Sequence, residues 1–330
     1  MGLLPRLSCL VASLLLASLA RAQQGDVVGI HDPAAIATTD GQFVLLCSGR
    51  LIPIYRSNDL FTWRRAGNVF GPELPTWAKE EIPTTRGIWA PDLSFFGGKY
   101  HLYYAVSLFG KNRSCIGHAT NLTLDDKDPR YQWVDHGKVI ETHPSDSWNA
   151  IDPNVVLDEE KHPWLSMGSY WSGIKLHRLE DETGALSKED PKLYDLAARP
   201  RGGAIEAPYI VRHDGFYYLF VSFDKCCMGS GSTYNIRVGR SRAIRGPYVD
   251  RENKPMLEGG ATMVLAGSGN VRGPGHCAIL SVRGQDFLVH HFYDANNNGM
   301  KTLQIRPLKW DEAGWPVAGE PLAAAPGLSR

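Results

Sequence analysis

Hydrophobic residues recur along the chain in short runs, and pairs of these runs repeat five times. In each repeat, a polar or acidic residue near a proline or glycine precedes an apolar run, then a turn rich in Gly and Asp, then a second apolar run rich in aromatic residues. Short apolar runs bounded by turn residues predict β-strands. The paired runs cover residues 29–36 and 40–46, 87–96 and 97–104, 149–157 and 161–167, 204–211 and 214–220, and 273–280 and 284–291.

The spacing of these repeats predicts the fold class. Pro33, Pro91, Pro153 and Pro208 mark the first four repeats at intervals of 58, 62 and 55 residues, and His276 follows 68 residues later. Each interval has room for about four strands at 8–12-residue spacing. Five repeats of four strands are typical of an all-β, five-bladed β-propeller around a central channel.

The residues beside these prolines are the candidates for chemistry. Proline is tolerated at the first residue of a strand, so the marked positions open one strand of each blade. In a radial fold such strand starts converge at one end of the central channel, where we expect the active site. If Asp-Pro and Ala-Pro only began turns, five occurrences in phase would be unexplained. The converging residues are Asp32, Asp152, Glu206 and His276, with Trp89 and Asp92 beside the second strand start.

Three carboxylic acids in one cleft predict acid–base chemistry. Close carboxylates cannot all stay ionised, so their pKa values move apart and leave one acid protonated and another ionised near neutral pH. A carboxylate pair with aromatic surroundings favours glycoside hydrolysis. Clustered acids also bind Ca²⁺, which takes six to eight oxygen ligands. The residue types alone leave both uses open.

The first 22 residues have the pattern of a secretory signal peptide. Leu10 to Leu19 form an apolar stretch too short to cross a bilayer, and Ala20-Arg21-Ala22 is a small-x-small cleavage site. We therefore expect a signal peptide at 1–22, a single catalytic domain at 23–330, and a secreted, extracellular protein without a membrane span. The sequons at Asn112 and Asn121 fit a eukaryotic secretory route and predict a glycoprotein.

The amino-acid composition limits the kinds of molecule that this protein can bind. The 330 residues are 43% hydrophobic and carry 35 basic and 35 acidic side chains, which excludes wholesale disorder and argues against nucleic-acid binding. Five cysteines remain after residue 22, too few and too scattered for a disulfide scaffold. The adjacent Cys226 and Cys227 either bond to each other or stay two separate thiols. We expect a monomer that binds carbohydrate.

The strand-start motifs are similar to those of glycoside hydrolase family 43, and more narrowly to its endo-α-1,5-L-arabinanase branch. The resemblance runs over nearly all of the mature chain, and the stretches Ser222–Gly229 and Ser232–Asn235 also look like this branch. It implies a five-bladed propeller that hydrolyses its substrate with inversion. The motifs are His31-Asp-Pro33, Trp89-Ala-Pro-Asp92, Ile151-Asp-Pro-Asn154, Ile205-Glu-Ala-Pro208 and Gly273-Pro-Gly-His276.

Carried over residue by residue, the resemblance assigns three catalytic roles. Asp32 matches the general base that activates water, and Glu206 matches the general acid. Asp152 matches the carboxylate that orients Glu206 and raises its pKa. Inversion requires the base and the acid to stand about 6.5–9.5 Å apart, a gap that opposed blades can supply.

The resemblance also implies a cation, usually calcium, held by His276 in the central channel. Calcium prefers oxygen ligands, so one imidazole with water would be an unusual shell. His276 would otherwise only form a hydrogen bond in the channel.

Five further residues are candidates for substrate binding. An aromatic ring stacks on a sugar and a polar side chain bonds its hydroxyls, but each type also serves packing or backbone satisfaction. These candidates are His31, Trp89, Phe109, Asn149 and Ser169.

Together these observations predict a secreted arabinanase that cleaves internal α-1,5 bonds of arabinan, the side chain of pectin, or of arabino-oligosaccharides. An exo-acting α-L-arabinofuranosidase or a β-xylosidase on the same scaffold is the alternative. A carbohydrate-binding propeller without catalysis is a third interpretation, which the presence of all three acids disfavours. How the ring closes, and whether the groove is open, cannot be read from the residues.

Overall fold

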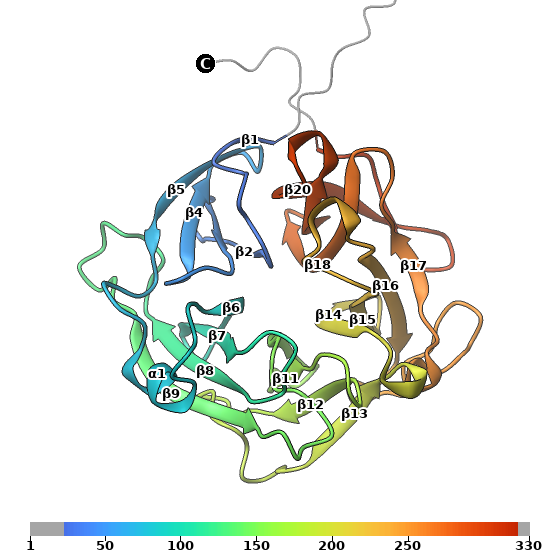
Figure 1. The fold of residues 1–330 in the computed structure, drawn as a ribbon, viewed down its shortest axis with the longest axis horizontal. Coiled ribbons are helices and arrows are strands. Elements are labelled where there is room, and N and C mark those ends of the chain that lie inside the picture. The colour runs from blue at the N-terminus through green and yellow to red at the C-terminus, as the bar shows by residue number, and fades with distance from the viewer. Residues whose placement is uncertain (1–22, 323–330) are drawn as a thin grey trace, which may run out of the picture.

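The computed structural model describes residues 23–322, which form five sheets of mainly antiparallel strands arranged radially around a central space (Figure 1). This arrangement confirms the predicted all-β, five-bladed propeller. The expected signal peptide lies outside the described residues. Within them, α1 (Thr76–Glu81) is the one α-helix, beside the 3₁₀ turns η1 (Pro200–Gly202), η2 (Gly229–Gly231), η3 (Met256–Glu258) and η4 (Ala295–Asn297). No helix in 23–322 has the length and apolar character needed to span a membrane.

The strands follow the chain blade by blade. Blade 1 contains β1 (Gln24–Gly25), β2 (Ala34–Ala37), β3 (Phe43–Leu46), β4 (Pro53–Ser57) and β5 (Thr62–Asn68). Blade 2 contains β6 (Trp89–Phe96), β7 (Lys99–Ser107), β8 (Ser114–Asn121) and β9 (Val134–Thr142). Blade 3 contains β10 (Asn154–Leu157), β11 (Pro163–Met167), β12 (Ile174–Arg178) and β13 (Leu193–Ala197). Blade 4 contains β14 (Ile205–His213), β15 (Phe216–Phe223), β16 (Asn235–Ser241) and β17 (Thr262–Leu265). Blade 5 contains β18 (Val271–Val282), β19 (Gln285–Asp294), β20 (Met300–Trp310) and β21 (Pro316–Ala318).

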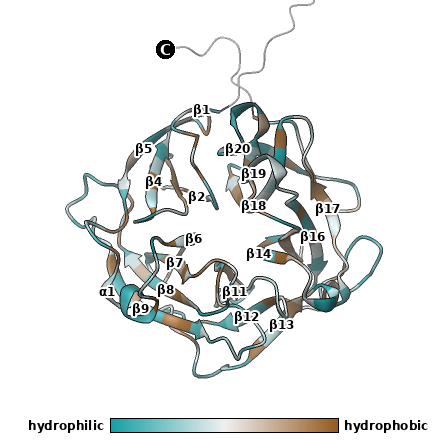
Figure 2. Ribbon diagram, in the orientation of Figure 1, coloured by the Kyte–Doolittle hydropathy of each residue, from teal (hydrophilic) through white to brown (hydrophobic). Residues whose placement is uncertain are grey.

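The hydrophobic core is divided into five clusters, each between neighbouring blades. Successive side chains of a strand point to opposite faces of its sheet. In β3, Leu45 therefore packs toward blade 5 while Val44 and Leu46 pack toward blade 2. In β15, Leu219 faces blade 3 and Phe220 faces blade 5. Apolar residues are accordingly concentrated on the strands, as Figure 2 shows. Both faces of a blade are buried near the middle of its sheet, so strands such as β7 and β8 are buried along almost their whole length, whereas the outer strands β5 and β9 are largely exposed.

The ring closes between blades 1 and 5. Val28 forms an antiparallel bridge with Thr302 of β20, and the backbone N–H of Gly29 donates to the carbonyl of Lys301 at 2.7 Å. The first described residues thus pair with the last blade, while β1 pairs in parallel with β5 of blade 1. A shared cluster that includes Leu45 of blade 1 and Val289 of blade 5 fills the space between the two blades.

The innermost strand of every blade begins with the same backbone feature. One residue there has a positive φ, which L-residues other than glycine rarely adopt. In the three inner strands that already contain this residue, the pairing register shifts beside it. The five residues are Asp32 (φ 50°), Ala90 (45°), Asp152 (57°), Ala207 (53°) and His276 (49°). The prediction that the motifs open equivalent strands agrees with this pattern, except that Glu206 precedes its positive-φ residue by one position.

Side chains of the preceding blade hold these strand starts. The N–H of Ala90 donates to Ser48 Oγ at 2.7 Å, and that of Ala207 donates to Asp152 Oδ2 at 3.0 Å. The N–H of His276 donates to Ser222 Oγ at 2.9 Å. A buried backbone N–H without a partner is costly, so these bonds stabilise a conformation that the strand alone would avoid.

Candidate active site

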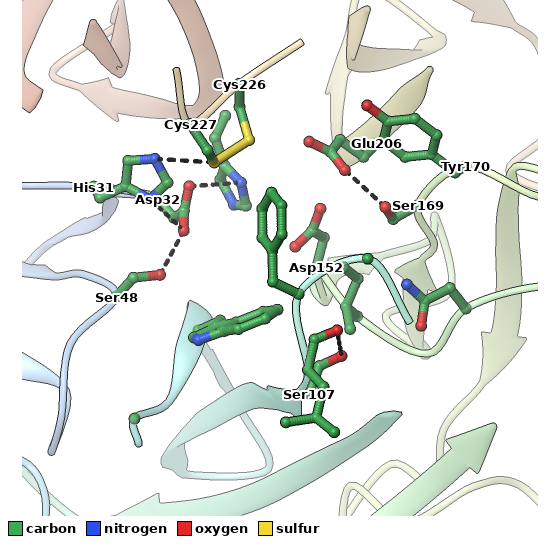
Figure 3. A pocket seen from close by; sticks show the side chains of 18 of the residues that line it. His31, Asp32, Ser48, Ser107, Asp152, Ser169, Tyr170, Glu206, Cys226 and Cys227 are labelled. Atoms are coloured by element: carbon green, nitrogen blue, oxygen red, sulfur yellow. Dashed lines mark hydrogen bonds and ion pairs between the residues drawn. A yellow bond between two sulfur atoms is a disulfide. The ribbon is translucent and has the colours of Figure 1, made fainter. Parts of the chain in front are cut away.

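A cavity of about 1070 Å³ opens where the inner strands begin. The four residues predicted to converge, Asp32, Asp152, Glu206 and His276, all line it. The five residues predicted to bind substrate line the same cavity, namely His31, Trp89, Phe109, Asn149 and Ser169. In Figure 3, Asp32 lies on one side of the cavity, and Asp152 and Glu206 lie on the other.

Asp32 is surrounded by hydrogen-bond donors and imidazoles. Its Oδ2 accepts from Ser48 Oγ and lies 2.9 Å from His31 Nδ1. Its Oδ1 lies 3.2 Å from His276 Nδ1, and its backbone N–H donates to His291 Nδ1 at 3.1 Å. Burial would raise the pKa of Asp32, but the neighbouring histidines outweigh it and hold that pKa well below the usual value. Asp32 is therefore an ionised carboxylate at neutral pH.

The pKa values of Asp152 and Glu206 are shifted in the direction opposite to that of Asp32. Burial raises the pKa of Asp152 well above its ordinary value, and the charge of Glu206 raises it further. Burial also raises the pKa of Glu206, against the lowering effect of hydrogen bonds from Tyr234 and Ser169. Ser169 Oγ donates to Glu206 Oε2 at 2.7 Å and Tyr234 Oη donates to Oε1. One cavity thus combines an ionised carboxylate with a pair that retains a proton.

The binding candidates differ in how freely they face the cavity. The Phe109 side chain is 78% exposed, and Trp89 is half-buried. Asn149 is buried and its Oδ1 accepts from Ser114 Oγ at 2.6 Å. The hydroxyl of Ser169 donates its hydrogen bond to Glu206. Phe109 and Trp89 can therefore stack on a sugar. Asn149 and Ser169 are already hydrogen-bonded to other side chains of the protein.

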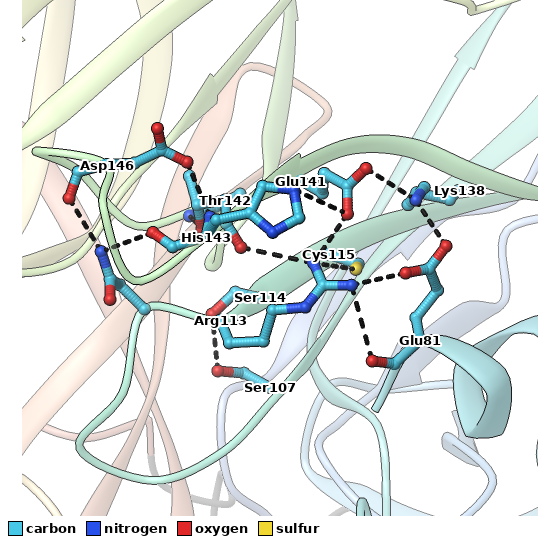
Figure 4. Close-up of polar contacts among 12 residues, drawn as sticks. Glu81, Ser107, Arg113, Ser114, Cys115, Lys138, Glu141, Thr142, His143 and Asp146 are labelled. Carbon is cyan, nitrogen blue, oxygen red and sulfur yellow. Dashed lines mark hydrogen bonds and ion pairs between the residues drawn. The ribbon is translucent and has the colours of Figure 1, made fainter. Parts of the chain in front are cut away.

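The loop that carries Phe109 is fastened at its base. Asn112 Nδ2 donates to the carbonyl of Asp146 at 2.9 Å, and Arg113 forms ion pairs with Glu81 of α1 and Glu141 of β9 (Figure 4). The exposed aromatic ring is thus presented from a fixed support.

Several residues that line the cavity were not among the site residues predicted from the sequence. Ser48, Tyr234 and the bonded pair Cys226–Cys227 all line the cavity. His291 of β19 accepts a hydrogen bond from the backbone N–H of Asp32, a contact that no sequence motif indicates. Of these, Tyr234 and the cysteines stood within stretches that resembled the family, but nothing there identified them as contacts of the acids.

Asp92 does not line the cavity. It accepts from Asn154 Nδ2 at 3.0 Å and from the N–H of Val155 at 2.9 Å, and so joins blade 2 to blade 3. Burial raises its pKa to about 6. Asp92 lies beside the second strand start, as expected, but its side chain points toward blade 3 and not into the cavity with the other acids.

The expected glycosylation conflicts with the structure. The side chains of Asn112 and Asn121 are buried, with 5% and 2% of their surface exposed. Asn112 Nδ2 also donates to backbone carbonyls of residues 143–148. N-linked glycans lie on the protein surface, so the burial of both asparagines argues against occupancy of either sequon.

The donor atoms beside Asp32 include a cluster with the spacing of metal ligands. His31, Asp32 and His291 each offer one ligand atom, and these atoms lie within 4.8 Å of one another. The cluster is rich in nitrogen, whereas calcium prefers oxygen. His276 and Asp32 Oδ1 could hold a cation that takes its remaining ligands from water.

Known proteins resemble this chain over most of its length. The sequence model for "Glycosyl hydrolases family 43" matches residues 28–316. An extracellular endo-α-(1→5)-L-arabinanase 1 of Bacillus subtilis is 42% identical, over 87% of both chains. An extracellular exo-α-(1→5)-L-arabinofuranosidase of Cellvibrio japonicus is 41% identical, over 93% of this chain and 91% of that protein. A solved α-L-arabinanase of Cellvibrio cellulosa, complexed with arabinohexaose, superimposes with a TM-score of 0.85 at 39% identity, over 89% and 96% of the two chains. The chain belongs to glycosyl hydrolases family 43.

Proposed function

We propose that this protein is an inverting glycoside hydrolase that cleaves internal α-1,5-L-arabinofuranosidic bonds of arabinan. The observation that carries the proposal is the split in acidity within one cavity. The pKa of Asp32 is lowered while those of Asp152 and Glu206 are raised. An inverting glycosidase needs one ionised carboxylate and one protonated carboxyl group on opposite sides of the bond.

Asp32 is the general base in this mechanism. Its Oδ2 is held by Ser48 and His31, so Oδ1, which lies 3.2 Å from His276 Nδ1, is the oxygen that accepts a proton from water. The water oxygen forms a bond with the anomeric carbon as the glycosidic bond breaks, and the configuration inverts.

Glu206 is the general acid, and it gives its proton to the departing oxygen. Tyr234 and Ser169 hold its two carboxyl oxygens in place. Asp152 lies close enough for its charge to couple to that of Glu206. Close carboxyl groups do not both ionise, so the pair retains one proton. In the reactive state Glu206 gives this proton to the leaving group while Asp152 carries the negative charge.

The expected cation fits this site as a hydrated ion beside His276 and Asp32. When bound, it would supply positive charge that favours the ionised form of the base. The protein residues alone perform the proton transfers.

The substrate class is inferred from the relatives. Two relatives above 40% identity are named endo-α-(1→5)-L-arabinanase and exo-α-(1→5)-L-arabinofuranosidase, and a solved relative is complexed with arabinohexaose. These names, together with the exposed Phe109 and half-buried Trp89 in the cavity, support a furanose chain as the ligand.

The test is the product pattern from linear α-1,5-arabinan. Endo cleavage releases oligosaccharides of several lengths from the first time points, with a rapid fall in viscosity. One product length from the start contradicts endo action, and no release of reducing ends despite binding contradicts hydrolysis altogether. Nuclear magnetic resonance of the first product reports whether the anomeric configuration inverts.

Exo action is the second candidate, favoured by one observation. The exo-acting relative from Cellvibrio japonicus is as similar to this chain as the endo-acting relative from Bacillus subtilis. Arabinohexaose labelled at its reducing end separates the two, because an exo-enzyme shortens it in steps of constant length.

Secretion is proposed on the extracellular names of both relatives and on the pattern of residues 1–22. N-terminal sequencing of protein from the culture medium should begin at Gln23. Light scattering of the same material tests the expected monomer.

A further inference from the structure

The two adjacent cysteines are bonded to each other at the edge of the catalytic cavity. Cys226 and Cys227 form a disulfide and both line the cavity, next to His31 in Figure 3. Cys227 has φ 68°, a left-handed conformation that residues with a side chain rarely adopt. The bond closes a small ring that restricts the backbone of both residues and helps to hold this conformation.

A chain of hydrogen bonds leads from this ring to Asp32. The N–H of Cys227 donates to Tyr293 Oη at 2.8 Å, and Tyr293 Oη lies 2.8 Å from His31 Nε2. His31 Nδ1 lies 2.9 Å from Asp32 Oδ2. A backbone N–H can only donate, so Tyr293 is free to donate its own proton to His31 Nε2. His31 then carries its proton on Nδ1 and donates it to Asp32.

The loop that carries the disulfide also reaches the other side of the cavity. It is fastened at its base, where the N–H groups of Thr233 and Tyr234 donate to the carbonyl of Lys225 at 2.9 and 3.1 Å. Tyr234 then donates to Glu206. One loop therefore contacts the acid through Tyr234 and the base through the Tyr293–His31 chain.

A role in overall stability does not account for this disulfide. Cross-links stabilise a fold mainly by restricting the unfolded chain, and the effect grows with the length of the loop they close. Neighbouring residues enclose no such loop, so the effect of the bond is local.

We propose that the Cys226–Cys227 disulfide is a positioning element for the general base. It aims the Cys227 N–H at Tyr293, and through Tyr293 and His31 it fixes the orientation of the Asp32 carboxylate. This inference rests on the proposed function, in which Asp32 activates water. Tyr293 and His31 are positioning residues in the same chain.

The first experiment compares three proteins on arabinan. Cys226→Ser/Cys227→Ser and Tyr293→Phe should each lower kcat about tenfold or more with KM little changed, because a small misplacement of a reacting group costs up to about 10²-fold. Ser230→Ala is the matched control, since Ser230 is exposed on the same loop and its side chain has no hydrogen bond among the described residues. Thermal melting of all variants should match that of the control.

The second experiment measures coupling. If both changes break one chain, the variant that combines them should lose no more activity than either alone. Losses that multiply would overturn the proposal, as would an unchanged kcat or a rise in KM alone, which would mean that the disulfide contacts sugar.

Reduction of the unmodified protein provides a test without substitution. A dithiol such as dithiothreitol transfers two electrons and two protons to the disulfide and becomes a cyclic disulfide itself. The three other cysteines of the described chain are buried free thiols, so the reagent acts on this pair. Activity should fall to that of the double serine variant, which should not respond to the reagent.

A readout without activity separates this proposal from the proposed function. Nitrogen-15 resonance of His31 at one fixed pH reports which ring nitrogen carries the proton. The proton should sit on Nδ1 in the oxidised protein, and this preference should weaken after reduction and in Tyr293→Phe. An unchanged spectrum in both cases overturns the positioning role even if arabinan is not the substrate. Loss of the Nδ1 preference in a protein inactive on arabinan would overturn only the proposed function.

Discussion

The carboxylate of Asp152 accepts a hydrogen bond from the backbone N–H of Ala207 at 3.0 Å, and Ala207 is the residue that follows Glu206. One acid therefore holds the backbone that presents the other, in addition to its effect on charge. These two roles can be separated by substitution.

Asp152→Asn keeps an oxygen that can accept from Ala207 but removes the charge near Glu206. The pKa of Glu206 should then fall, so the alkaline limb of the pH profile of kcat/KM should move to lower pH. We expect kcat to drop by about two to four decades, the scale of acid–base assistance, while the melting temperature is kept. Asp152→Ala should lose both activity and stability. An unshifted alkaline limb in Asp152→Asn would contradict the electrostatic role.

The base and the acid should respond differently to chemical rescue. Glu206→Ala should regain activity on an aryl arabinofuranoside, because a good leaving group needs no proton. Asp32→Ala should gain nothing from the leaving group but should gain from azide, a small nucleophile that needs no base. Initial rates with both additions decide the assignment. Equal rescue of the two variants by either treatment would be incompatible with it.

Acid should destabilise the fold through two buried histidines. His101 and His118 are 0% and 3% exposed, and His101 Nδ1 lies 2.9 Å from His118 Nε2. Burial lowers the pKa of His101 to about 4 and that of His118 to about 3. Below about pH 6.5 these two histidines bind protons in the unfolded chain but stay neutral in the folded protein. The free energy of unfolding should therefore fall as the pH drops from about 6.5 toward 4.

Each histidine contributes at most about 1.4 kcal/mol per pH unit to this loss. Urea unfolding at pH 7, 6 and 5 measures it. His118→Gln should flatten the dependence, whereas His143→Gln, at a side chain that is 54% exposed, should not. An equal slope in both variants would show that other groups cause the acid sensitivity.

The cation beside His276 is tested by removal. If His276 holds it, a chelator should lower activity and the melting temperature, because a ligand bound only by the folded state stabilises that state. His276→Ala should reproduce the effect and become insensitive to further chelation. A histidine that only forms hydrogen bonds would give a less stable variant with the ordinary response to chelator. Elemental analysis of active enzyme without any bound metal would rule the cation out and leave the three-carboxylate mechanism intact.

The burial of both sequons predicts an unglycosylated protein. Material secreted by a eukaryotic host should keep its mass after treatment with an N-glycan-releasing enzyme. A glycan at Asn112 would displace the amide that supports the Phe109 loop, so an occupied fraction should be less stable.

The ring and the convergence of the three acids in one cavity could be predicted because their signals are local. Asp32 and Asp152 stand directly before a proline, in the positive-φ position that begins an inner strand, and Glu206 stands one residue earlier in its repeat. The local sequence around each acid therefore predicts that it lies at the start of an inner strand.

The residues that support these acids come from other blades or later strands. His291 and Tyr293 lie on β19, and Tyr234 lies on the loop before β16. Their contacts with Asp32 or Glu206 depend on strand register and on the packing between blades, and no local pattern carries that information. Asp92 shows the same limit, because a shift of one position along the pleat turned it toward the neighbouring blade.

The closure of the ring between blades 1 and 5 has a consequence for inactivation. The N–H of Asp32 in blade 1 donates to His291 Nδ1 in blade 5, so the backbone of the proposed general base is bonded across the contact between these two blades. Separation of these two blades would remove the base from its imidazoles while the other four interfaces stay packed. Loss of catalysis should therefore precede global unfolding. The activity of the enzyme should measure whether the contact between blades 1 and 5 is intact.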